Sequence, residues 1–281
     1  MAENKFPDPN SLKITQENTI KYINQYEGIS HIRIEIPKNT KFPLLPYRQD
    51  NGRVVFPTGV LEGWYSHIEI REAIKEGAIL IKVYKTQYFT KTCRPFKSYV
   101  ETLYNLRLKY KAESSPMEYV TKIMLNSLYG KFGQRWRGLD NWVHSDTISL
   151  KELEKAETIE RKGVYMRLGG INGKPKTFSV PVWAVYVTAY GRLKLHKAIK
   201  TTDPIYCDTD SLITKSELKT SSKLGELKLE MNIIEGVVVR PKFYALREKG
   251  QDEFNGYVKI KGLGRRLKYL EFFGFLCKPT I

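Results

Sequence analysis

The chain has 281 residues, 41% of them hydrophobic, which is enough for one large or two modest domains with packed cores. Its formal net charge of +17 favours a polyanionic partner, nucleic acid first, although a soluble basic protein with scattered lysines would give the same total. No apolar run approaches the roughly 20 residues of a membrane helix, so we expect no membrane span.

The N-terminus and the cysteines favour a reducing compartment. The N-terminus lacks the apolar core of a signal peptide, so we do not expect secretion. Cys93, Cys207 and Cys277 show neither C-x-x-C spacing nor a pattern of pairs, which predicts no zinc site and no disulfide framework.

Alternating strands and short helices predict an α+β fold in the first part of the chain. The predicted strands are 31–36, 53–56 and 78–84, and a short helix covers 71–76. The histidines are isolated from one another, so no histidine metal cluster or nucleophilic triad is indicated.

Two helices are predicted next, on either side of the break at Ser114-Ser115-Pro116, and we expect them to form an antiparallel pair. The apolar residues expected on the inner face of the second helix are Met117, Val120, Ile123, Met124 and Leu128, together with Ser127.

A second stripe on this helix suits a nucleotide. Lys122, Asn126 and Tyr129 fall at i, i+4 and i+7, offset from the apolar stripe, and Gly130 follows. Lysine suits a triphosphate, and tyrosine suits the face of a base or sugar. An amphipathic helix with a solvated lysine and a capping glycine would explain the same spacing.

Residues 136–177 are polar and predict an inserted hairpin module, with a helix near 149–157, a strand over 163–168 and a turn at Asn172-Gly173. A core helix follows over 180–199, and its His196 is expected to pack rather than to bind a ligand.

Residues 204–213 contain paired carboxylates between short β-prone runs. Ile205-Tyr206-Cys207 and Leu212-Ile213-Thr214 predict the two strands of a hairpin with Asp-Thr-Asp-Ser at its tip. Residues two apart in an extended chain point the same way, so Asp208 and Asp210 are expected to project together. Like charges that close favour a hard divalent cation such as Mg²⁺ between them. An exposed acidic turn is the alternative.

Three strands are expected towards the C-terminus. Residues 224–230 alternate as a strand, Lys242 and Tyr244 are expected on one face of another, and Lys259 and Lys261 on one side of the last.

Three of these stretches, in this order, resemble a family B DNA polymerase. Residues 122–130 match K-x-x-x-N-S-x-Y-G of the fingers, residues 206–211 match Y-x-D-T-D-S of the palm, and residues 242–244 match K-x-Y. The form of residues 126–133 is similar to the protein-primed polymerases of phages, linear plasmids and related mobile elements. The matching stretches run from about residue 63 to residue 262, which is most of the chain.

The resemblance implies an antiparallel palm sheet with packed helices, helical fingers, an inserted β-hairpin module and little thumb. The implied layout is a partial palm with a priming-protein-type insertion at 1–95, fingers at 96–135, the hairpin module at 136–178, palm at 179–262 and the start of a thumb at 263–281. By position, the family's insertions would be residues 14–60 and 136–177.

The resemblance also implies a role for each matching residue. Asp210 would be the principal ligand of a two-Mg²⁺ site and Asp208 a weaker or indirect one. Lys122 would bind the triphosphate of a dNTP, and Asn126 and Tyr129 would line the nascent base pair. The residues implied at the primer or template are Thr209, Lys242, Tyr244, Lys259 and Lys261. The reaction would be in-line attack of a 3′-oxygen, or of a protein hydroxyl, on an α-phosphate.

The sequence departs from the family in one motif. D-x-x-S-L-Y-P, which supplies a further palm carboxylate, is not found; Asp8-Pro9-Asn10-Ser11-Leu12 resembles its start, but Lys13-Ile14 follow. We therefore expect a C-terminal portion of a split or truncated polymerase that also lacks the exonuclease domain and is inactive alone.

The expected partners are primer–template DNA, dNTPs, a terminal priming protein, and a second chain with the missing segments. The expected compartment is a host cytoplasm, or an organelle for a linear plasmid. A non-catalytic DNA-binding remnant, or a basic structural protein with a chance acidic turn, would share these features. The priming mechanism stays open.

Overall fold

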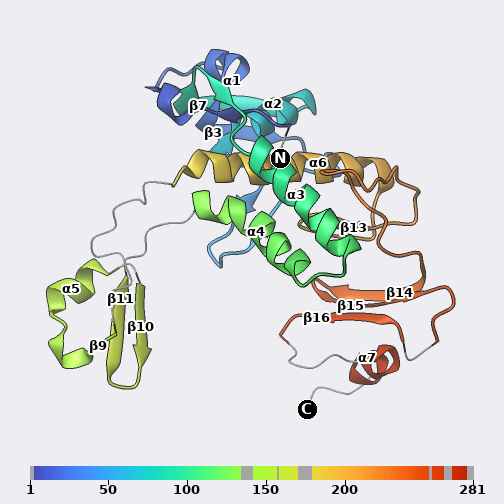
Figure 1. The fold of residues 1–281 in the computed structure, drawn as a ribbon. Helices are drawn as coiled ribbons and strands as arrows, with labels where there is room; N and C mark the ends of the chain where they lie inside the picture. Colours follow the sequence, from blue (N-terminus) through green and yellow to red (C-terminus); the bar gives the residue numbers. More distant parts are fainter. Residues whose placement is uncertain are drawn as a thin grey trace. The chain divides into compact units, whose positions relative to one another are not determined.

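The computed structural model describes residues 3–133, 142–156, 158–169, 179–252, 255–262 and 268–276, and Figure 1 shows their fold. The chain divides into two compact units, residues 1–190 and 191–281, and α6 (Pro181–Thr202) continues from one into the other. All strand pairs in these ranges are antiparallel, and helices accompany them, so the predicted α+β class is confirmed.

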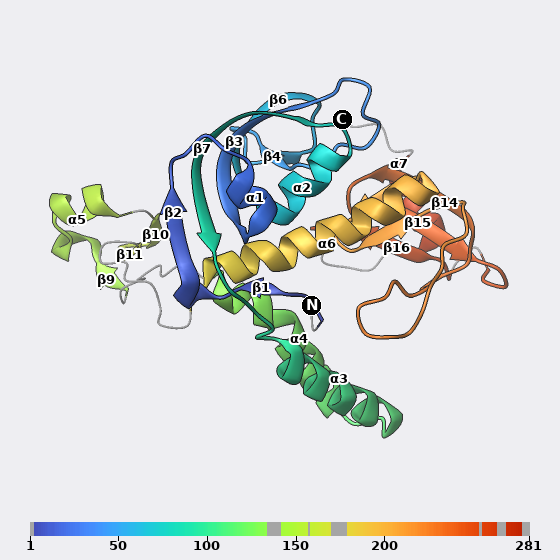
Figure 2. The same cartoon turned by 90° about the horizontal axis from the view of Figure 1, so that it is seen from above.

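A four-stranded sheet dominates the first unit. Its strands, in spatial order, are β2 (Leu12–Thr15), β7 (Ile79–Phe89), β3 (Glu27–Ile36) and β6 (Gly59–Ser66). Ile32 and Ile34 of β3 point to the buried face, where α1 (Lys21–Gln25) and α2 (His67–Lys75) pack (Figure 2). Residue 60, the expected end of the first insertion, lies within β6. Strands β2 and β3, which precede it, pair with β6 and β7, so the sheet contains residues from both sides of that boundary.

Helix α2 begins four residues earlier than predicted. Ser66 is its N-cap: the Ser66 hydroxyl accepts a hydrogen bond from the Glu69 amide at 3.4 Å and donates one to the Glu69 carboxylate at 2.6 Å. This Ser-x-x-Glu arrangement starts a helix. The predicted start at residue 71 missed this capping pair.

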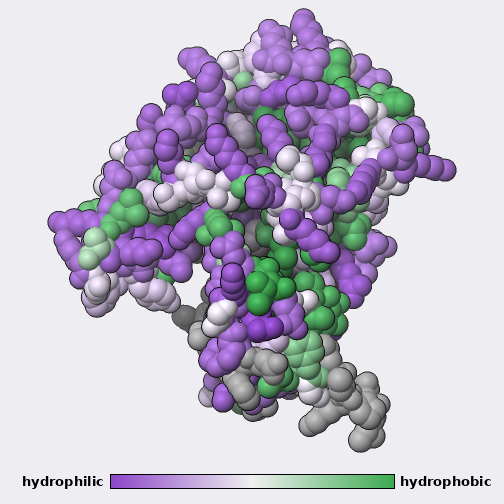
Figure 3. Space-filling view, turned by 90° about the vertical axis from the view of Figure 1, so that its right-hand side faces the viewer, coloured by the Kyte–Doolittle hydropathy of each residue, from purple (hydrophilic) through white to green (hydrophobic). Residues whose placement is uncertain are grey.

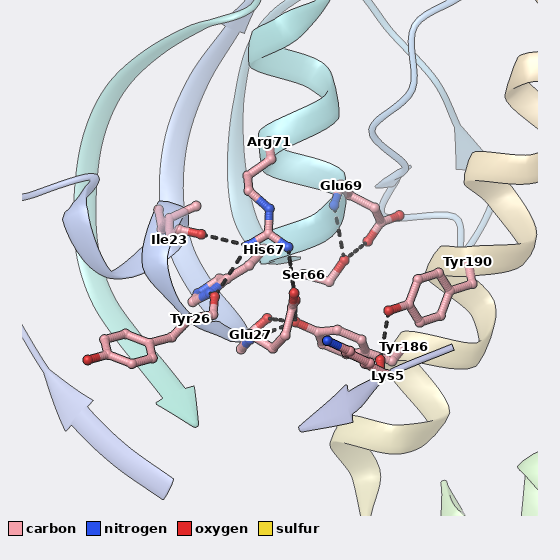
Figure 4. A network of polar contacts seen from close by, with 11 residues as sticks. Lys5, Ile23, Tyr26, Glu27, Ser66, His67, Glu69, Arg71, Tyr186 and Tyr190 are labelled. Atoms are coloured by element: carbon pink, nitrogen blue, oxygen red, sulfur yellow. Dashed lines mark hydrogen bonds and ion pairs between the residues drawn. The ribbon is translucent and has the colours of Figure 1, made fainter. Parts of the chain in front are cut away.

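A buried polar chain lies between this sheet and α2. His67 is fully buried, and its Nδ1 lies 2.7 Å from the Tyr26 carbonyl oxygen (Figure 4). Its Nε2 lies 2.9 Å from Ser30 Oγ. Because a carbonyl only accepts, Nδ1 carries the proton and Nε2 accepts from Ser30. Burial lowers the pKa of His67 to about 4.

A second network anchors the N-terminal part of α6 to β3 (Figure 4). The buried Tyr186 hydroxyl accepts from the Gly28 amide at 2.6 Å and lies 2.8 Å from Glu27 Oε2, to which it donates. Arg71 donates to both oxygens of Glu27, at 2.8 and 3.0 Å. Burial raises the pKa of Tyr186 well above its usual value, so the phenol stays a donor. A Cβ at position 28 would lie 2.1 Å from the Gln87 carbonyl oxygen, so only glycine fits.

The predicted antiparallel helix pair is α3 (Lys97–Ala112) and α4 (Met117–Phe132), joined by an ion pair between Arg107 and Glu118 at 2.8 Å. The predicted inner face of α4 is confirmed at Leu128 but wrong at four positions, where exposed fractions are 44% for Met117, 42% for Val120, 48% for Ile123 and 40% for Met124. Thr121 is buried, and Leu125 and Phe132 join Leu128 against a core of Phe6, Phe96, Val100 and Tyr186. The position of that core, rather than the wider apolar stripe, decides which side turns inward.

Smaller elements complete the first unit. They are β1 (Phe6–Pro7) paired with β8 (Thr92–Cys93), the short helix η1 (Pro9–Ser11), and β4 (Tyr47–Arg48) paired with β5 (Val54–Val55). Residues 142–156 and 158–169 form β9 (Val143–His144), η2 (Ser145–Thr147), α5 (Leu150–Lys155), β10 (Thr158–Lys162) and β11 (Tyr165–Gly169). A β10–β11 hairpin is thus present; the turn predicted at Asn172-Gly173 lies outside the described residues.

The second unit contains two antiparallel assemblies. One is the hairpin of β12 (Tyr206–Asp208) and β13 (Ser211–Ile213); the other is the sheet of β14 (Ile233–Arg240), β15 (Phe243–Glu248) and β16 (Tyr257–Ile260). Phe243 and Ala245 of β15 are buried against Tyr269 and Phe272 of α7 (Tyr269–Leu276).

The strand predicted over residues 224–230 is not formed. Leu224 and Leu229 are 41% and 54% exposed, and the segment is held by the Lys194 side chain, which donates to the Gly225 carbonyl and lies 3.2 Å from Glu226. Alternation makes a strand only where another strand offers its edge.

The surface drawn in Figure 3 is mostly hydrophilic, with hydrophobic residues gathered in smaller patches. Across the described ranges, no helix is both long and apolar enough to cross a membrane.

The buried His67 makes the stability of the fold dependent on pH. Its pKa of about 4 lies below the 6.5 of an unfolded histidine, so as pH falls the unfolded chain takes up the proton first. Stability should be complete above pH 6.5 and should fall by up to about 3 kcal/mol by pH 4. Urea unfolding measured across this range checks the slope.

His67→Gln should be less stable at pH 7.5 but show a shallower slope, because the titrating group is gone. His144→Gln, at a half-exposed histidine, is the control and should keep the native slope. An unchanged slope in His67→Gln would show that other groups cause the pH dependence.

Candidate active site

The predicted Asp-Thr-Asp hairpin is formed, and its turn is tighter than expected. The pairs Tyr206–Ile213 and Asp208–Ser211 leave only Thr209 and Asp210 in the loop. Thr209 has a φ of +58°, which is uncommon for a β-branched residue. Two local bonds fix this turn: the Asp210 amide donates to the Asp208 carbonyl at 2.6 Å, and Thr209 Oγ1 donates to Asp208 Oδ1 at 2.9 Å.

The two carboxylates therefore differ in environment. Asp208 is the last residue of a strand and its side chain is 29% exposed, whereas Asp210 lies in the turn and is exposed. The two side chains were predicted to project together from an extended chain, but the chain turns between them, so strand geometry does not fix their relative direction. The Asp210 carboxylate makes no hydrogen bond or ion pair within the described part of the chain, so both of its oxygens can accept a cation.

Lys242 lies in a second tight turn. Arg240 and Phe243 are paired, which leaves Pro241 and Lys242 as the loop between β14 and β15. Proline followed by a residue at positive φ (+59° for Lys242) matches a type II turn, where glycine is usual.

Two contacts join this turn to the Asp hairpin. The Lys242 amide donates to the Tyr206 hydroxyl at 3.0 Å, and Lys242 Nζ lies 3.5 Å from Asp208 Oδ2. Tyr206 and Asp208 are two apart in β12, so both reach Lys242 from one side of the strand. The half-exposed ion pair adds under about 1 kcal/mol, so its importance is geometric.

A row of tyrosines continues from the hairpin across the sheet. The ring centroids of Tyr206 and Tyr244 are 5.5 Å apart, and those of Tyr244 and Tyr257 are 6.2 Å apart. Lys259 lies directly opposite Tyr244 in the β15–β16 pair, so the two share this face. Burial, and the nearby Tyr257, Tyr206 and Asp208, raise the pKa of Tyr244.

Each of the two residue pairs predicted to share a strand face has only one member in a strand. Lys242 precedes β15 and Lys261 follows β16, so each lies in a turn while Tyr244 and Lys259 lie in strands. The turns are joined, since the Lys261 amide donates to the Lys242 carbonyl at 3.0 Å.

The nucleotide stripe lies on α4 in the first unit. Lys122, Asn126 and Tyr129 are all exposed on this helix, as the spacing predicts. Glu118, one turn before Lys122, is held by Arg107, which lowers the pKa of the Glu118 carboxyl. The Lys122 ammonium thus remains available for an anion.

Tyr206 and Tyr257 flank Tyr244 in the row of tyrosines beside the Asp hairpin, although the sequence analysis gave neither a role. Tyr206 could have been found from the strand period, since it is two residues before Asp208. Tyr257 had no such signal, because only the register of β16 against β15 places it beside Tyr244.

The carboxylates fit a hard divalent cation in chemistry but do not complete a site. Exposed aspartate oxygens are the ligands that Mg²⁺ takes in proteins. No group of three or more His, Cys, Asp or Glu side chains that could hold a metal occurs among the residues whose structure is described. Asp208 and Asp210 would therefore supply only part of the coordination.

The acidic hairpin and the Lys-x-Tyr turn of the second unit, and the Lys-Asn-Tyr stripe on α4 of the first, each contain one of the motifs that resemble a family B DNA polymerase. The family model for DNA polymerase type B, organellar and viral, matches residues 1–219. The chain belongs to this family, as its motifs indicated.

Relatives agree with this membership, and a solved structure agrees with it in fold. The chain is 28% identical to a probable DNA polymerase of Neurospora intermedia over 93% of its own length and 29% of the relative's. It is 27% identical to the DNA-directed DNA polymerase of Enterobacteria phage PRD1, covering 96% of this chain and 46% of that one. The fold matches phi29 DNA polymerase complexed with primer-template DNA and incoming nucleotide substrates, with a TM-score of 0.68, 21% identity, and 94% and 48% of the two chains covered.

Tyr206→Phe should loosen the Lys242 turn. Removing the hydroxyl leaves the Lys242 amide without its acceptor, at a cost of about 1 kcal/mol. Hydrogen–deuterium exchange of the Lys242 amide should become faster, while the ring contact with Tyr244 is kept. Tyr257→Phe is the matched control, because it removes a hydroxyl from the same face without removing that bond. Equal protection in Tyr206→Phe and the native chain would refute this account of the turn.

Proposed function

We propose that this chain carries the nucleotidyl-transfer region of a DNA-directed DNA polymerase, which extends a primer 3′-hydroxyl or a hydroxyl of a priming protein. The observation that carries the proposal is the joined pair of turns, in which Lys242 contacts both Tyr206 and Asp208. The named activity of the relatives supports the same assignment. Because the chain covers 29% or less of the first fungal relatives' length, the activity of a whole polymerase is part of the proposal.

In this proposal the acidic hairpin binds the catalytic metals. Asp210, exposed at the tip, is the principal ligand, and Asp208 is a weaker one because Lys242 and Thr209 already engage its oxygens. Two Mg²⁺ ions, when bound, activate the attacking oxygen and stabilise the leaving pyrophosphate. A further carboxylate must complete the site; the family's D-x-x-S-L-Y-P pattern, which would supply it, does not occur in these 281 residues.

The lysines and tyrosines of the second unit would hold the primer strand. Tyr244 and Lys259 offer a phenol and a cation side by side, which suits a sugar and its phosphate. Lys242 and Lys261 place two further cations in adjoining turns. Thr209 follows Asp208, the residue that Lys242 contacts, at the tip of the Asp hairpin.

The exposed stripe on α4 would bind the incoming dNTP. Lys122 would neutralise the triphosphate, and Asn126 and Tyr129 would line the nascent base pair. Such charge neutralisation and positioning carry most of the catalysis of phosphoryl transfer.

The domain layout expected from sequence is also part of the proposal: palm segments at 1–95 and 179–262, fingers at 96–135, the hairpin module at 136–178 and the start of a thumb at 263–281. A priming protein and a chain supplying exonuclease and palm segments are the further partners. The site of action would be a host cytoplasm or an organelle.

A non-catalytic DNA-binding role is the alternative, and it is favoured by the absence of a third carboxylate near Asp208 and Asp210 in the described part of the chain. The two functions differ in whether a complemented chain extends a primer.

Asp210→Ala should abolish primer extension by the chain reconstituted with the missing palm segment, by more than about a hundredfold, because a metal ligand is lost. DNA binding, measured by anisotropy of a labelled primer–template, should be largely kept, because phosphate contacts dominate affinity. Glu217→Ala is the control, since Glu217 is another exposed acid of the second unit. Extension at the native rate by Asp210→Ala would reject the metal-ligand role; no extension by any complemented chain would favour the DNA-binding remnant.

Lys122→Ala should raise the KM for dNTP without changing the affinity for DNA. Loss of one cation at a triphosphate should raise the KM for dNTP by roughly tenfold, since a charge-assisted contact contributes about 1.5–3 kcal/mol. Steady-state extension at varied dNTP measures this, and Lys131→Ala, nine residues further along α4, should leave the KM unchanged. A KM shift of equal size in both variants would point to general charge rather than to a nucleotide site.

A further inference from the structure

The face of the four-stranded sheet opposite α1 and α2 carries an unusual set of side chains. Successive residues of β3 alternate, so His31 and Arg33 point away from the buried Ile32 and Ile34. Strand register places Trp64 opposite His31 on one side and Lys85 on the other. A solvated sheet face normally carries small or polar residues, so an exposed tryptophan here calls for an explanation.

Three rings lie against one another on this face. The Trp64 and His31 rings are 5.5 Å apart with a 20° interplanar angle, and the His31 and Tyr84 rings are 4.9 Å apart at 31°. Lys82 Nζ lies 4.9 Å from the centre of the Tyr84 ring. Trp64 is nevertheless 47% exposed. The indole is thus held in a fixed orientation with a surface open for stacking.

Cations surround this ring stack. Arg33 and Lys82 are direct neighbours across the β3–β7 pair, and both are exposed. Neither they nor the half-buried Lys85 form an ion pair within the described ranges, so their charges can reach an external anion. Two carboxylates share this face. Glu62 accepts a hydrogen bond from the Tyr84 hydroxyl at 3.0 Å and lies 3.7 Å from His31 Nε2. Glu35, two residues after Arg33 in β3, is exposed on the same side but makes no hydrogen bond or ion pair with the rings.

We propose that this face binds single-stranded nucleic acid, with one base stacked on Trp64 and the adjoining phosphates on Arg33, Lys82 and Lys85. Single strands are held by aromatic side chains interleaved with cations, and sheet faces provide such platforms in other proteins. A protein partner is the less favoured occupant, since lysine is depleted at protein interface cores. The site is separate from the Asp hairpin and does not require polymerase activity.

Photocrosslinking locates the proposed contact directly. A single-stranded oligonucleotide containing 5-iododeoxyuridine is irradiated with the full chain, and crosslinked peptides are identified by mass spectrometry. Peptides that contain Trp64 or Tyr84 should be crosslinked, and excess unlabelled single strand should compete them away. Crosslinks confined to the second unit would overturn the proposal.

Substitutions with opposite expected effects make the test independent of folding. Trp64→Ala should weaken binding of a labelled oligo-dT by about tenfold, because stacking on one aromatic side chain contributes about 1–3 kcal/mol. Glu62→Gln should tighten it severalfold, because the carboxylate that contacts the ring stack is removed. Phe56→Ala, at an equally exposed ring outside this sheet (45%), is the matched control and should change nothing.

Binding measured in an Asp210→Ala background should show the same pattern, which separates this site from the proposed metal site. Unchanged affinity in both Trp64→Ala and Glu62→Gln would refute the proposal. So would a change in self-association seen by size exclusion without a change in oligo-dT affinity, because it would assign the face to a protein contact.

Discussion

The hydrogen bond from the Lys242 amide to the Tyr206 hydroxyl is the contact on which the candidate site depends. It joins two tight turns, and each turn contains a non-glycine residue at positive φ, Thr209 in one and Lys242 in the other. A non-glycine residue in this backbone conformation destabilises the fold by about 1 kcal/mol or more, and the conformation persists only where the surroundings fix it. Here the bonds of Asp208 within its turn and the Tyr206 bond between the turns provide that fixation, so the carboxylates and the lysine share one rigid support.

Much of the fold follows from local sequence signals. The Asp hairpin, the α3–α4 pair and the core helix α6 were all predicted, because turn residues and apolar spacing act over a few neighbours. The errors arise where distant contacts decide. Residues 224–230 alternate but find no partner strand, and α4 turns Leu125 rather than Ile123 inward because Phe96 and Tyr186 form the core elsewhere.

The candidate site shows the same limit. Motif spacing selected residues that the structure gathers around the Asp hairpin and its neighbouring turn, but strand period misplaced Asp210, Lys242 and Lys261, because the chain turns at each of them. Alternation predicts direction only while the chain stays extended. Thr209 and Lys242 carry no glycine or asparagine signal that would have revealed those turns, and Tyr257 enters the site through register alone.

Charge counting has a similar weakness, since a net +17 says little about which cations can meet a phosphate. Lys242 is partly engaged by Asp208, whereas Lys122 is available because Arg107 already holds Glu118. Lys82 is held over the Tyr84 ring without a carboxylate partner in the described residues. The basic character of this chain therefore acts through a few cations that the fold leaves unpaired beside aromatic rings, and those positions, rather than the total, favour nucleic acid over another polyanion.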